Sequence, residues 1–269
     1  MQDRRGRLDG KVGIVTGAGS SGAGVGTGKA IAIMYAREGC RVLLADAVRD
    51  RAEETLVAVQ AEGGEAFVMQ ADVTQADECR QMVKAAVDRY GGLDILVNNV
   101  GILAPGNVMD VDEADWNRVI DTNLKSMMLT SKYAVPQMIE SGGGAIINLT
   151  SFMALRGGYA SEPVAYSASK GGVTALTTAM ASEHGRDNIR VNAIAPGYLY
   201  TPMVAATMTK ELRELRRRSA PLGTEGTAWD VGWAAIYLAS DEARWVTGVT
   251  LPVDAGILAT SPLAMHHRM

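Results

Sequence analysis

Residues 12–29 read Val-Gly-Ile-Val-Thr-Gly-Ala-Gly-Ser-Ser-Gly-Ala-Gly-Val-Gly-Thr-Gly-Lys, a short apolar run followed by a glycine-rich loop. Val12–Thr16 has the β-branched character of a buried strand, and apolar residues recur at helical spacing over Ala30–Arg37. Glycines between a strand and a helix let the backbone turn tightly and approach a pyrophosphate, which the amide groups at the helix N-terminus attract. The stretch therefore predicts the first strand–loop–helix unit of a dinucleotide-binding fold.

The same alternation of short apolar runs and longer helical stretches continues along the chain. Seven runs are predicted strands: Val12–Thr16, Arg41–Ala45, Ala66–Gln70, Ile95–Val97, Ala145–Leu149, Arg190–Ile194 and Val249–Val253. Six stretches are predicted helices: Ala30–Arg37, Arg51–Ala61, Ala76–Tyr90, Ala114–Ile139, Ala165–His184 and Thr227–Ala239. Strand, helix and strand with short connections are typical of right-handed βαβ units. We therefore predict an α/β protein with a single-domain Rossmann fold over residues 1–269, a doubly wound, seven-stranded parallel sheet with helices on both faces.

The composition restricts the classes of function. The chain of 269 residues has a formal net charge of -4, which argues against nucleic acid or anionic lipid as a partner. Met1 is followed by polar and charged residues, unlike a signal peptide, and no apolar run reaches the roughly 20 residues of a membrane span. Cys40 and Cys79 form no Cys-x-x-Cys motif and are too few for a disulfide framework. We expect a soluble, cytoplasmic protein that does not bind a membrane.

An acidic residue ends the second predicted strand. Asp46 follows the glycine-rich loop at the distance where a carboxylate accepts hydrogen bonds from the adenosine ribose of a dinucleotide. Its charge would repel a 2′-phosphate, so NAD is favoured over NADP. Arg49 and Arg51 lie nearby and leave NADP open, and the alternative interpretation of Asp46 is a solvated acid at a strand end.

A tyrosine and a lysine four residues apart lie on one face of a predicted helix, in Tyr166-Ser-Ala-Ser-Lys170. A lysine cation stabilises a phenolate and lowers the pKa of the tyrosine, which makes proton exchange with an alcohol feasible. Ser151 follows the strand Ala145–Leu149, where its hydroxyl can hydrogen-bond a substrate oxygen as charge develops. Thr150 is the alternative to Ser151 for this role.

With these motifs in this order, the chain resembles the short-chain dehydrogenase/reductase family over residues 8–256, which we take as the core, with short N- and C-terminal tails. The pieces that carry the resemblance follow the family's order: the Thr16-Gly17 loop, Asp72-Val73, Asn98-Asn99-Val100-Gly101, Asn123, Ser151, Tyr166-x-x-x-Lys170, Pro196-Gly197 and Val253-Asp254-Ala255-Gly256. The resemblance implies an enzyme with a catalytic set of Asn123, Ser151, Tyr166 and Lys170.

The resemblance also implies a role for each matching residue. Tyr166 would be the acid/base, Ser151 would polarise the carbonyl, and Asn123 would hold a water that connects Lys170 to solvent. Lys170 would hold the nicotinamide ribose, and Thr201 the nicotinamide carboxamide. Asp72 and Val73 would border the adenine, and Asn98 and Gly101 the adenosine side of the cleft. The full implied cofactor-binding set is Gly17, Gly19, Gly26, Thr27, Gly28, Asp46, Asp72, Val73, Asn99, Gly101, Tyr166, Lys170, Pro196, Gly197, Leu199 and Thr201.

Three departures from the family pattern matter. The glycine loop is longer than usual, so either Gly26 and Gly28 or Gly22 and Gly24 are its later pair. Val100 replaces the usual alanine. The loop Phe152–Pro163, between Ser151 and Tyr166, is enlarged and should border the substrate.

The family's layout places the substrate among Ile102–Ala104, Phe152–Tyr159 and Tyr198–Met208, which are mainly apolar and suit an alicyclic or aliphatic substrate. Arg156 would either grip a substrate carboxylate, which suggests a hydroxy acid, or extend into solvent. The helical stretch Lys210–Arg218 interrupts the strand–helix rhythm where ligands bind in such sheets, and it would cover the substrate or lie as a solvated surface helix.

Two predicted helices are candidates for a subunit interface. Ala165–Met180 is rich in small residues, and Ala114–Ile139 is apolar around much of its circumference. In the resembling family these helices meet across subunits, so we expect a homo-oligomer, a tetramer or a dimer. The histidines show no metal-ligand spacing, and we expect no metal: His184, His266 and His267.

Three functions fit the sequence. The first is an NAD-dependent oxidoreductase that acts on a secondary alcohol or ketone. The second is a 3-oxoacyl-thioester reductase of the same family, against which Asp46 argues if that enzyme needs NADPH. The third is a non-catalytic dinucleotide sensor or scaffold, which would have no need of a complete catalytic set.

Overall fold

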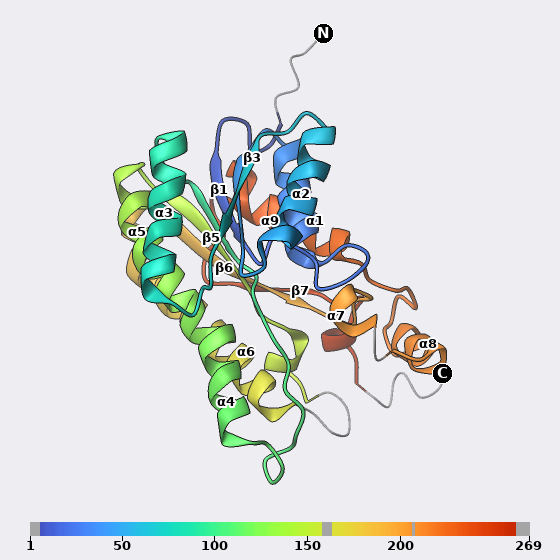
Figure 1. Ribbon diagram of the computed structural model, residues 1–269. Helices are drawn as coiled ribbons and strands as arrows, with labels where there is room; N and C mark the ends of the chain where they lie inside the picture. The colour runs from blue at the N-terminus through green and yellow to red at the C-terminus, as the bar shows by residue number, and fades with distance from the viewer. Residues whose placement is uncertain (1–5, 158–162, 206–207, 262–269) are drawn as a thin grey trace.

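Seven parallel strands form one sheet in the computed structural model, which describes residues 6–157, 163–205 and 208–261 (Figure 1). The strands are β1 (Val12–Thr16), β2 (Arg41–Asp46), β3 (Ala66–Gln70), β4 (Ile95–Asn98), β5 (Gly144–Leu149), β6 (Ile189–Pro196) and β7 (Thr250–Val253). They pair in the order β3-β2-β1-β4-β5-β6-β7. The strand order reverses between β1 and β4, the switch point at which α/β sheets bind ligands. The predicted single-domain Rossmann fold is confirmed.

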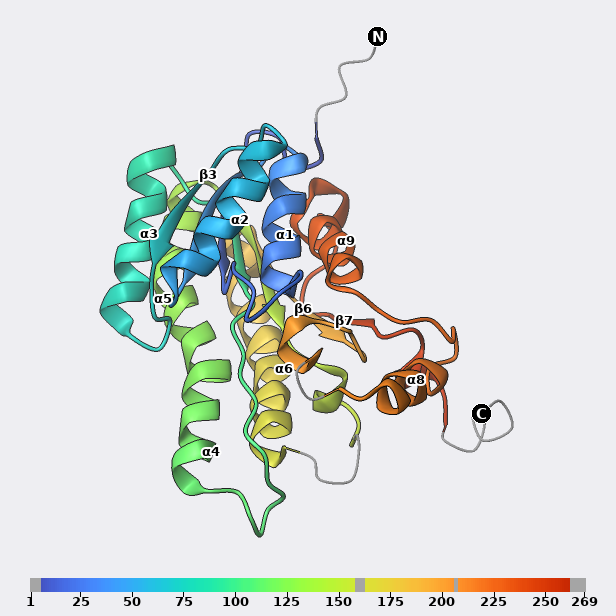
Figure 2. The same ribbon diagram turned by 45° about the vertical axis from the view of Figure 1, so that its right-hand side comes forward.

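Three helices cover each face of the sheet. One face carries α1 (Thr27–Arg37), α2 (Arg49–Ala61) and α9 (Ala228–Ala239), with α1 between the other two (Figure 2). The other carries α3 (Ala76–Tyr90), α5 (Ser126–Glu140) and α6 (Val164–His184). Successive residues of a strand face opposite sides of the sheet. Val15 packs in the core beneath α1, α2 and α9, and Ile14 in the core beneath α3, α5 and α6.

The predicted long helix Ala114–Ile139 is not uniform. It consists of α4 (Glu113–Ile120), a π-helical segment at Asp121–Lys125, and α5. π-helical turns occur often at functional sites, and this one contains Asn123. A π-helical turn contains one more residue than an α-helical turn, and the spacing of apolar residues in the sequence could not reveal it.

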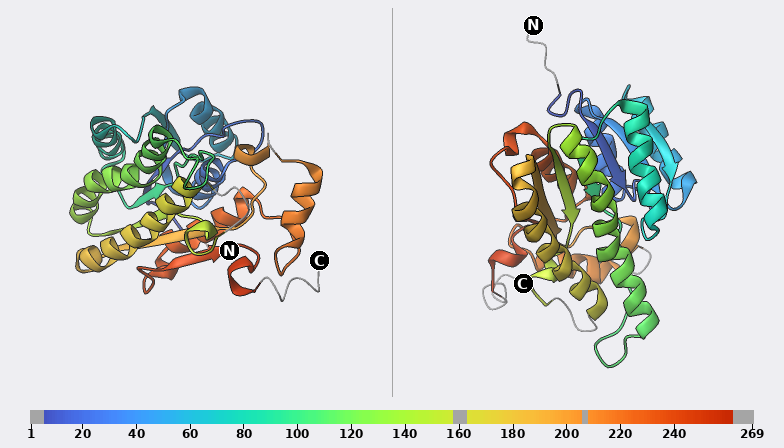
Figure 3. Two further views of the ribbon diagram at one scale, coloured as in Figure 1. Left: turned by 90° about the horizontal axis from the view of Figure 1, so that it is seen from below. Right: turned by 90° about the vertical axis from the view of Figure 1, so that its left-hand side faces the viewer.

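Two short helices lie beyond the carboxyl ends of the strands, across the molecule from α4 (Figure 3). The helix α8 (Lys210–Arg218) has its predicted bounds, whereas α7 (Pro202–Ala205) was not predicted. The remaining short helical segments are 3-10 turns at Phe152–Ala154, Gly185–Asp187, Asp241–Ala243 and Ile257–Ala259. Other predicted elements differ from the observed ones at their ends by up to three residues, where helix and strand limits are least defined by sequence.

The first turn of α1 packs directly against the loop that follows β1. A Cβ atom on Gly28 would lie 1.9 Å from the carbonyl oxygen of Gly17, and Gly17 itself has a φ of +61°. Both positions therefore require glycine, one for space and the other for its backbone conformation.

We expect Gly28→Ala to lower the melting temperature by several degrees, because overpacking costs about 1–3 kcal/mol. Gly171→Ala in α6 is the matched control, since nothing lies within 4 Å of its added Cβ and alanine favours helix over glycine by roughly 0.5–1 kcal/mol. Thermal unfolding of both variants checks this, and equal shifts would show that the Gly17–Gly28 contact is not tight.

Candidate active site

A cleft of about 1430 Å³ opens at the carboxyl ends of the strands. One end is formed by the loop after β1 and the start of α1, and the other by residues from the ends of β5 and β6 and from α6, α7 and α8. Of the implied catalytic and cofactor-binding residues, all but Asn98 and Asn123 line it: Gly17, Gly19, Gly26, Thr27, Gly28, Asp46, Asp72, Val73, Asn99, Gly101, Ser151, Tyr166, Lys170, Pro196, Gly197, Leu199 and Thr201.

The N-terminus of α1 faces the first end of this cleft. Gly26 is the N-cap residue, no side chain caps the helix, and its first turn contains no acidic residue. Uncapped amides and the positive end of the helix dipole suit an anionic diphosphate. The residues present therefore fit the dinucleotide that the loop predicts.

The rival assignment of the glycine loop is not supported. Gly26 and Gly28 line the cleft, whereas Gly22 and Gly24 do not. A Cβ on Gly22 or Gly24 would instead lie 3.7 Å or 3.6 Å from Pro202, at the start of α7. The enlarged part of the loop therefore reaches across to the substrate end of the cleft.

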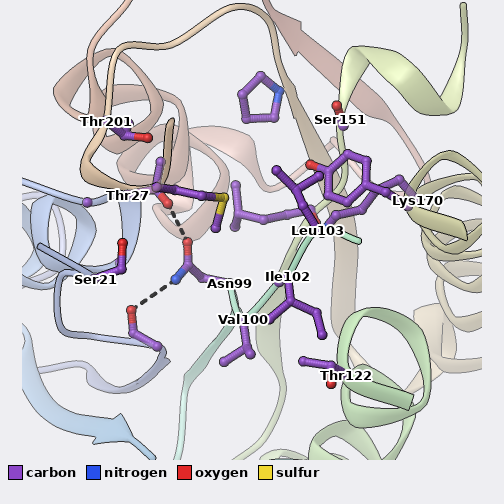
Figure 4. Close-up of a pocket in the computed structure, with 18 of the residues that line it drawn as sticks. Ser21, Thr27, Asn99, Val100, Ile102, Leu103, Thr122, Ser151, Lys170 and Thr201 are labelled. Carbon is purple, nitrogen blue, oxygen red and sulfur yellow. Dashed lines mark hydrogen bonds between the residues drawn. The ribbon is translucent and has the colours of Figure 1, made fainter. Parts of the chain in front are cut away.

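Thr27 and Asn99 hold this loop in place. The Thr27 hydroxyl donates to Oδ1 of Asn99 at 2.7 Å, and Nδ2 of Asn99 donates to the carbonyl of Gly17 at 3.0 Å (Figure 4). These bonds join the ends of β1 and β4 to the start of α1. Contact of either side chain with a cofactor stays a prediction.

Asp46 occupies the far end of the glycine-rich side. Its carboxylate accepts hydrogen bonds from the amides of Gly19 and Val48, each at 3.0 Å. Two carboxylate oxygens can accept further bonds from ribose hydroxyls. Arg51 lines the same end of the cleft, so a cation also lies there.

The position predicted for Asn98 was wrong. Asn98 is 1% exposed and does not line the cleft. Its amide donates to Asn148 and Ser131, and Thr130 donates to its carbonyl oxygen. Asn98 therefore belongs to a buried polar network between β4, β5 and α5, and its neighbour Asn99 faces the cleft. No signal in the sequence separates these adjacent asparagines.

Ser151 and Tyr166 meet at the second end of the cleft. The Tyr166 side chain is partly exposed to the cleft. Burial by the surrounding protein raises the pKa of its phenol, and a hydrogen bond with Ser151 acts to lower that pKa. The alternative residue Thr150 is buried, and its hydroxyl donates to the carbonyl of Lys170 at 2.8 Å. Ser151 is thus the hydroxyl that faces the tyrosine.

Lys170 lies behind the tyrosine ring. Its Nζ donates to the carbonyl of Leu149 at 2.6 Å and lies 5.6 Å from the centroid of the Tyr166 ring. Burial lowers the pKa of Lys170 to about 7. Burial is the largest influence on the pKa of both residues, and the lowering of the Tyr166 pKa by this lysine stays a prediction.

Asn123 supports the site from the π-helical segment. Its Oδ1 accepts from the amide of Ile102 at 2.8 Å, and its Nδ2 donates to the Ile102 carbonyl and to the Ser169 hydroxyl. The side chain is fully buried and connects the chain after β4 to α6 beside Lys170. Its role in holding a water stays a prediction.

The substrate end of the cleft is mainly apolar. The residues that line it beside Ser151 and Tyr166 are Ile102, Leu103, Phe152, Met153, Tyr198, Met203, Val204 and Arg216. Ala104 is buried in a small core instead. The predicted segments Phe152–Tyr159, Phe152–Pro163 and Tyr198–Met208 lie partly outside the described residues.

Neither interpretation of Arg156 was correct. Its guanidinium donates to the backbone carbonyls of Ile257 and Thr260, at 2.6 Å and 2.7 Å. Arg156 therefore fixes the C-terminal 3-10 turn and neither lines the cleft nor extends freely into solvent.

Sequence reasoning missed several residues that line the cleft. They include Ser21, Asn117, Arg118, Thr122 and Arg216. Arg216 lies in Lys210–Arg218, the stretch predicted either to cover the substrate or to be a solvated helix, and its presence in the cleft favours the covering role. The other residues come from turns and helix ends whose orientation no periodicity determines.

Two kinds of feature are absent from the described ranges. No helix there has the length and apolar character needed to cross a membrane. No group of three or more His, Cys, Asp and Glu side chains there could hold a metal ion. His266 and His267 lie outside the described residues.

Comparisons with known proteins agree with the fold. A family model described as enoyl-(acyl carrier protein) reductase matches residues 22–258. The 3-oxoacyl-(acyl-carrier-protein) reductase FabG of Thermotoga maritima is 35% identical over 252 residues, which cover 94% of this chain and 99% of the relative. The chain belongs to the short-chain dehydrogenase/reductase family, and it is an oxidoreductase of that family.

Two solved structures show the same fold. A protein described as a short-chain dehydrogenase/reductase from Burkholderia xenovorans is 41% identical with a TM-score of 0.91, covering 95% of this chain and 99% of that one. A protein described as a short-chain alcohol dehydrogenase from Sinorhizobium meliloti is 37% identical with a TM-score of 0.87, covering 94% and 98%.

The low pKa of Lys170 predicts a pH dependence of stability. Unfolded lysine keeps its proton to a pH of about 10.4, whereas folded Lys170 releases it near pH 7. The unfolded state therefore binds more protons between these values, and the free energy of unfolding rises with pH.

We expect Lys170→Met to remove this rise, which amounts to about 2 kcal/mol between pH 7 and pH 9. Urea unfolding at both pH values measures it. Lys210→Met, at an exposed position of α8, is the control and should keep the wild-type slope. An unchanged slope in Lys170→Met would mean that Lys170 stays protonated in the folded protein.

Proposed function

We propose that this protein is an NAD-dependent oxidoreductase that transfers a hydride between the nicotinamide and a secondary alcohol or ketone. The observation that carries the proposal is the arrangement of Ser151, Tyr166 and Lys170 at one end of a cleft whose other end is the glycine-rich loop.

The chain's own residues suggest how the dinucleotide would be held. The amides at the start of α1 would bind the diphosphate, Asp46 the adenosine ribose, Lys170 the nicotinamide ribose and Thr201 the carboxamide. When bound, nicotinamide accepts a hydride from the carbinol carbon during oxidation and returns it to the carbonyl carbon during reduction.

Proton transfer is the task of Tyr166. In reduction its phenol donates a proton to the oxygen of the substrate as charge develops there, and in oxidation the phenolate accepts the alcohol proton. Ser151 hydrogen-bonds the same oxygen. Because burial raises the pKa of Tyr166, the phenol predominates at neutral pH, which favours reduction there and alcohol oxidation at higher pH.

We expect Tyr166→Phe to lower kcat by roughly 10²- to 10⁴-fold, since general acid–base catalysis contributes that much. NAD binding should persist, because only one hydroxyl is lost. Absorbance at the reduced-nicotinamide band with a panel of alcohols and ketones measures the former, and calorimetry the latter. Tyr237→Phe, outside the cleft, is the matched control. Full activity in Tyr166→Phe would remove the proposed acid/base.

Asp46 supports NAD as the cofactor, because its carboxylate lines the cleft near the glycine-rich loop and its negative charge would repel a 2′-phosphate. We expect Asp46→Asn to reduce kcat/KM for NAD by about tenfold, as charged hydrogen bonds to ribose are lost, and to raise kcat/KM for NADP. Asp50→Asn, exposed at the start of α2, is the control. An unaltered cofactor ratio would place the adenosine ribose away from Asp46.

A second candidate is a 3-oxoacyl-thioester reductase. The observation that favours it is the 35% identity to the Thermotoga maritima FabG across 94% of the chain. Turnover of acetoacetyl-CoA well above that of simple ketones, with NADPH preferred, would support it over the NAD-dependent reaction. A sensor or scaffold is disfavoured because the catalytic set is complete.

The proposal extends to the setting of the enzyme. Cys40 and Cys79 are buried and do not form a disulfide, which suits a reducing compartment such as the cytoplasm. We also propose that the enzyme works as a homo-oligomer through α6 and the helix formed by α4 and α5, which size-exclusion chromatography with light scattering would test.

A further inference from the structure

A cation lies at the substrate end of the cleft without a part in the chemistry above. Arg216 of α8 is half-buried and lines the cleft. Its guanidinium carbon lies 4.5 Å from the centroid of the Tyr198 ring. Tyr198 packs edge-to-face on Phe152 at 4.8 Å between centroids, and Phe152 follows Ser151 directly. Two ring contacts therefore connect Arg216 to the reaction centre.

The neighbouring arginines of α8 differ from Arg216 in their partners. Arg213 forms an ion pair with Glu225, and Arg217 forms one with Glu214. Over residues 6–157, 163–205 and 208–261, no carboxylate lies within ion-pair distance of Arg216. Its side-chain contacts are the Tyr198 face and the sulfur of Met208 at 3.7 Å.

The electrostatic setting is unfavourable for this cation as it stands. Burial lowers the pKa of the Arg216 guanidinium, and the nearby Tyr198 and Glu225 offset this only in part. The Glu225 carboxylate already pairs with Arg213. A partly desolvated charge without a counter-ion is costly. A negatively charged group of a ligand beside the guanidinium would offset this free-energy cost.

We infer that Arg216 binds a carboxylate on the substrate, so that the preferred substrate is a ketone or secondary alcohol that bears a carboxylate away from the reacting carbon. The inference rests on the proposed hydride transfer. A guanidinium supplies parallel donors that match a carboxylate bidentately. Stacking on Tyr198 orients the plane of the guanidinium, and the apolar side chains around the cleft accommodate the carbon skeleton between the two groups.

Arg216 would thus determine specificity without taking part in proton transfer. The diphosphate of a dinucleotide is assigned to the opposite end of the cleft, at the start of α1. A purely structural Arg216, which only joins Tyr198 to Met208, would affect all substrates equally when replaced.

The test compares acid and ester forms of one ketone. The probes are 3-oxocyclohexanecarboxylate and 4-oxocyclohexanecarboxylate, each beside its methyl ester, with NADH in excess. The proteins are wild type, Arg216→Gln, and Arg218→Gln as a control on the same helix, exposed and outside the cleft. Thermal unfolding and the KM for NADH are measured for each.

We expect wild type to prefer an acid over its ester. Arg216→Gln should reduce kcat/KM for that acid by roughly 10- to 100-fold, as a charged hydrogen bond is lost. Its values for the ester and the KM for NADH should stay within about twofold, as should all values for Arg218→Gln.

Two results would overturn the inference, and they differ from each other. If the esters are reduced but Arg216→Gln lowers acids and esters alike, or neither, the hydride transfer stands and Arg216 has no role in specificity. If wild type reduces none of the probes or the simple ketones, the proposed function fails, and the role of Arg216 fails with it.

Discussion

The hydrogen bond from Lys170 to the carbonyl of Leu149 is the contact on which the site depends. It joins α6 to the last residue of β5, at 2.6 Å and out of contact with solvent. Ser151 leaves β5 two residues later, and Tyr166 lies one turn before Lys170 on α6. Together with the bond from the Thr150 hydroxyl to the Lys170 carbonyl, this contact brings the two hydroxyls close to each other. Burial of Lys170 also lowers the pKa of its ammonium group.

The fold was predictable because both of its signals are periodic. Parallel strands that are buried on both faces read as short apolar runs, and the helices between them read as amphipathic stretches. Lys210–Arg218 could be bounded from its charge pattern alone. The π-helical turn around Asn123 could not be predicted, because one extra residue in a turn leaves the apolar spacing on either side nearly unchanged.

The site was predictable to the extent that it is local in sequence. Tyr166 and Lys170 share a helix face, and Ser151 follows a strand that lies beside that helix. Arg156 shows the limit of such reasoning. The sequence places it beside the substrate loop, but its length allows it to reach the C-terminal turn instead, while Arg216, 60 positions along the chain, enters the cleft. The tertiary structure decides which groups lie within reach of a long side chain. The spacing of residues in the sequence therefore does not identify its partner.

The contact between the enlarged glycine loop and Pro202 restricts which segments can be exchanged between this protein and its relatives. Gly22 and Gly24 approach the first residue of α7, so the loop at the diphosphate end and the helix at the substrate end occupy adjoining space. A chimaera that imports a shorter loop would leave a gap beneath α7, and one that imports a bulkier α7 would collide with the loop. These two segments, far apart in the chain, form one exchangeable module and should be transplanted together.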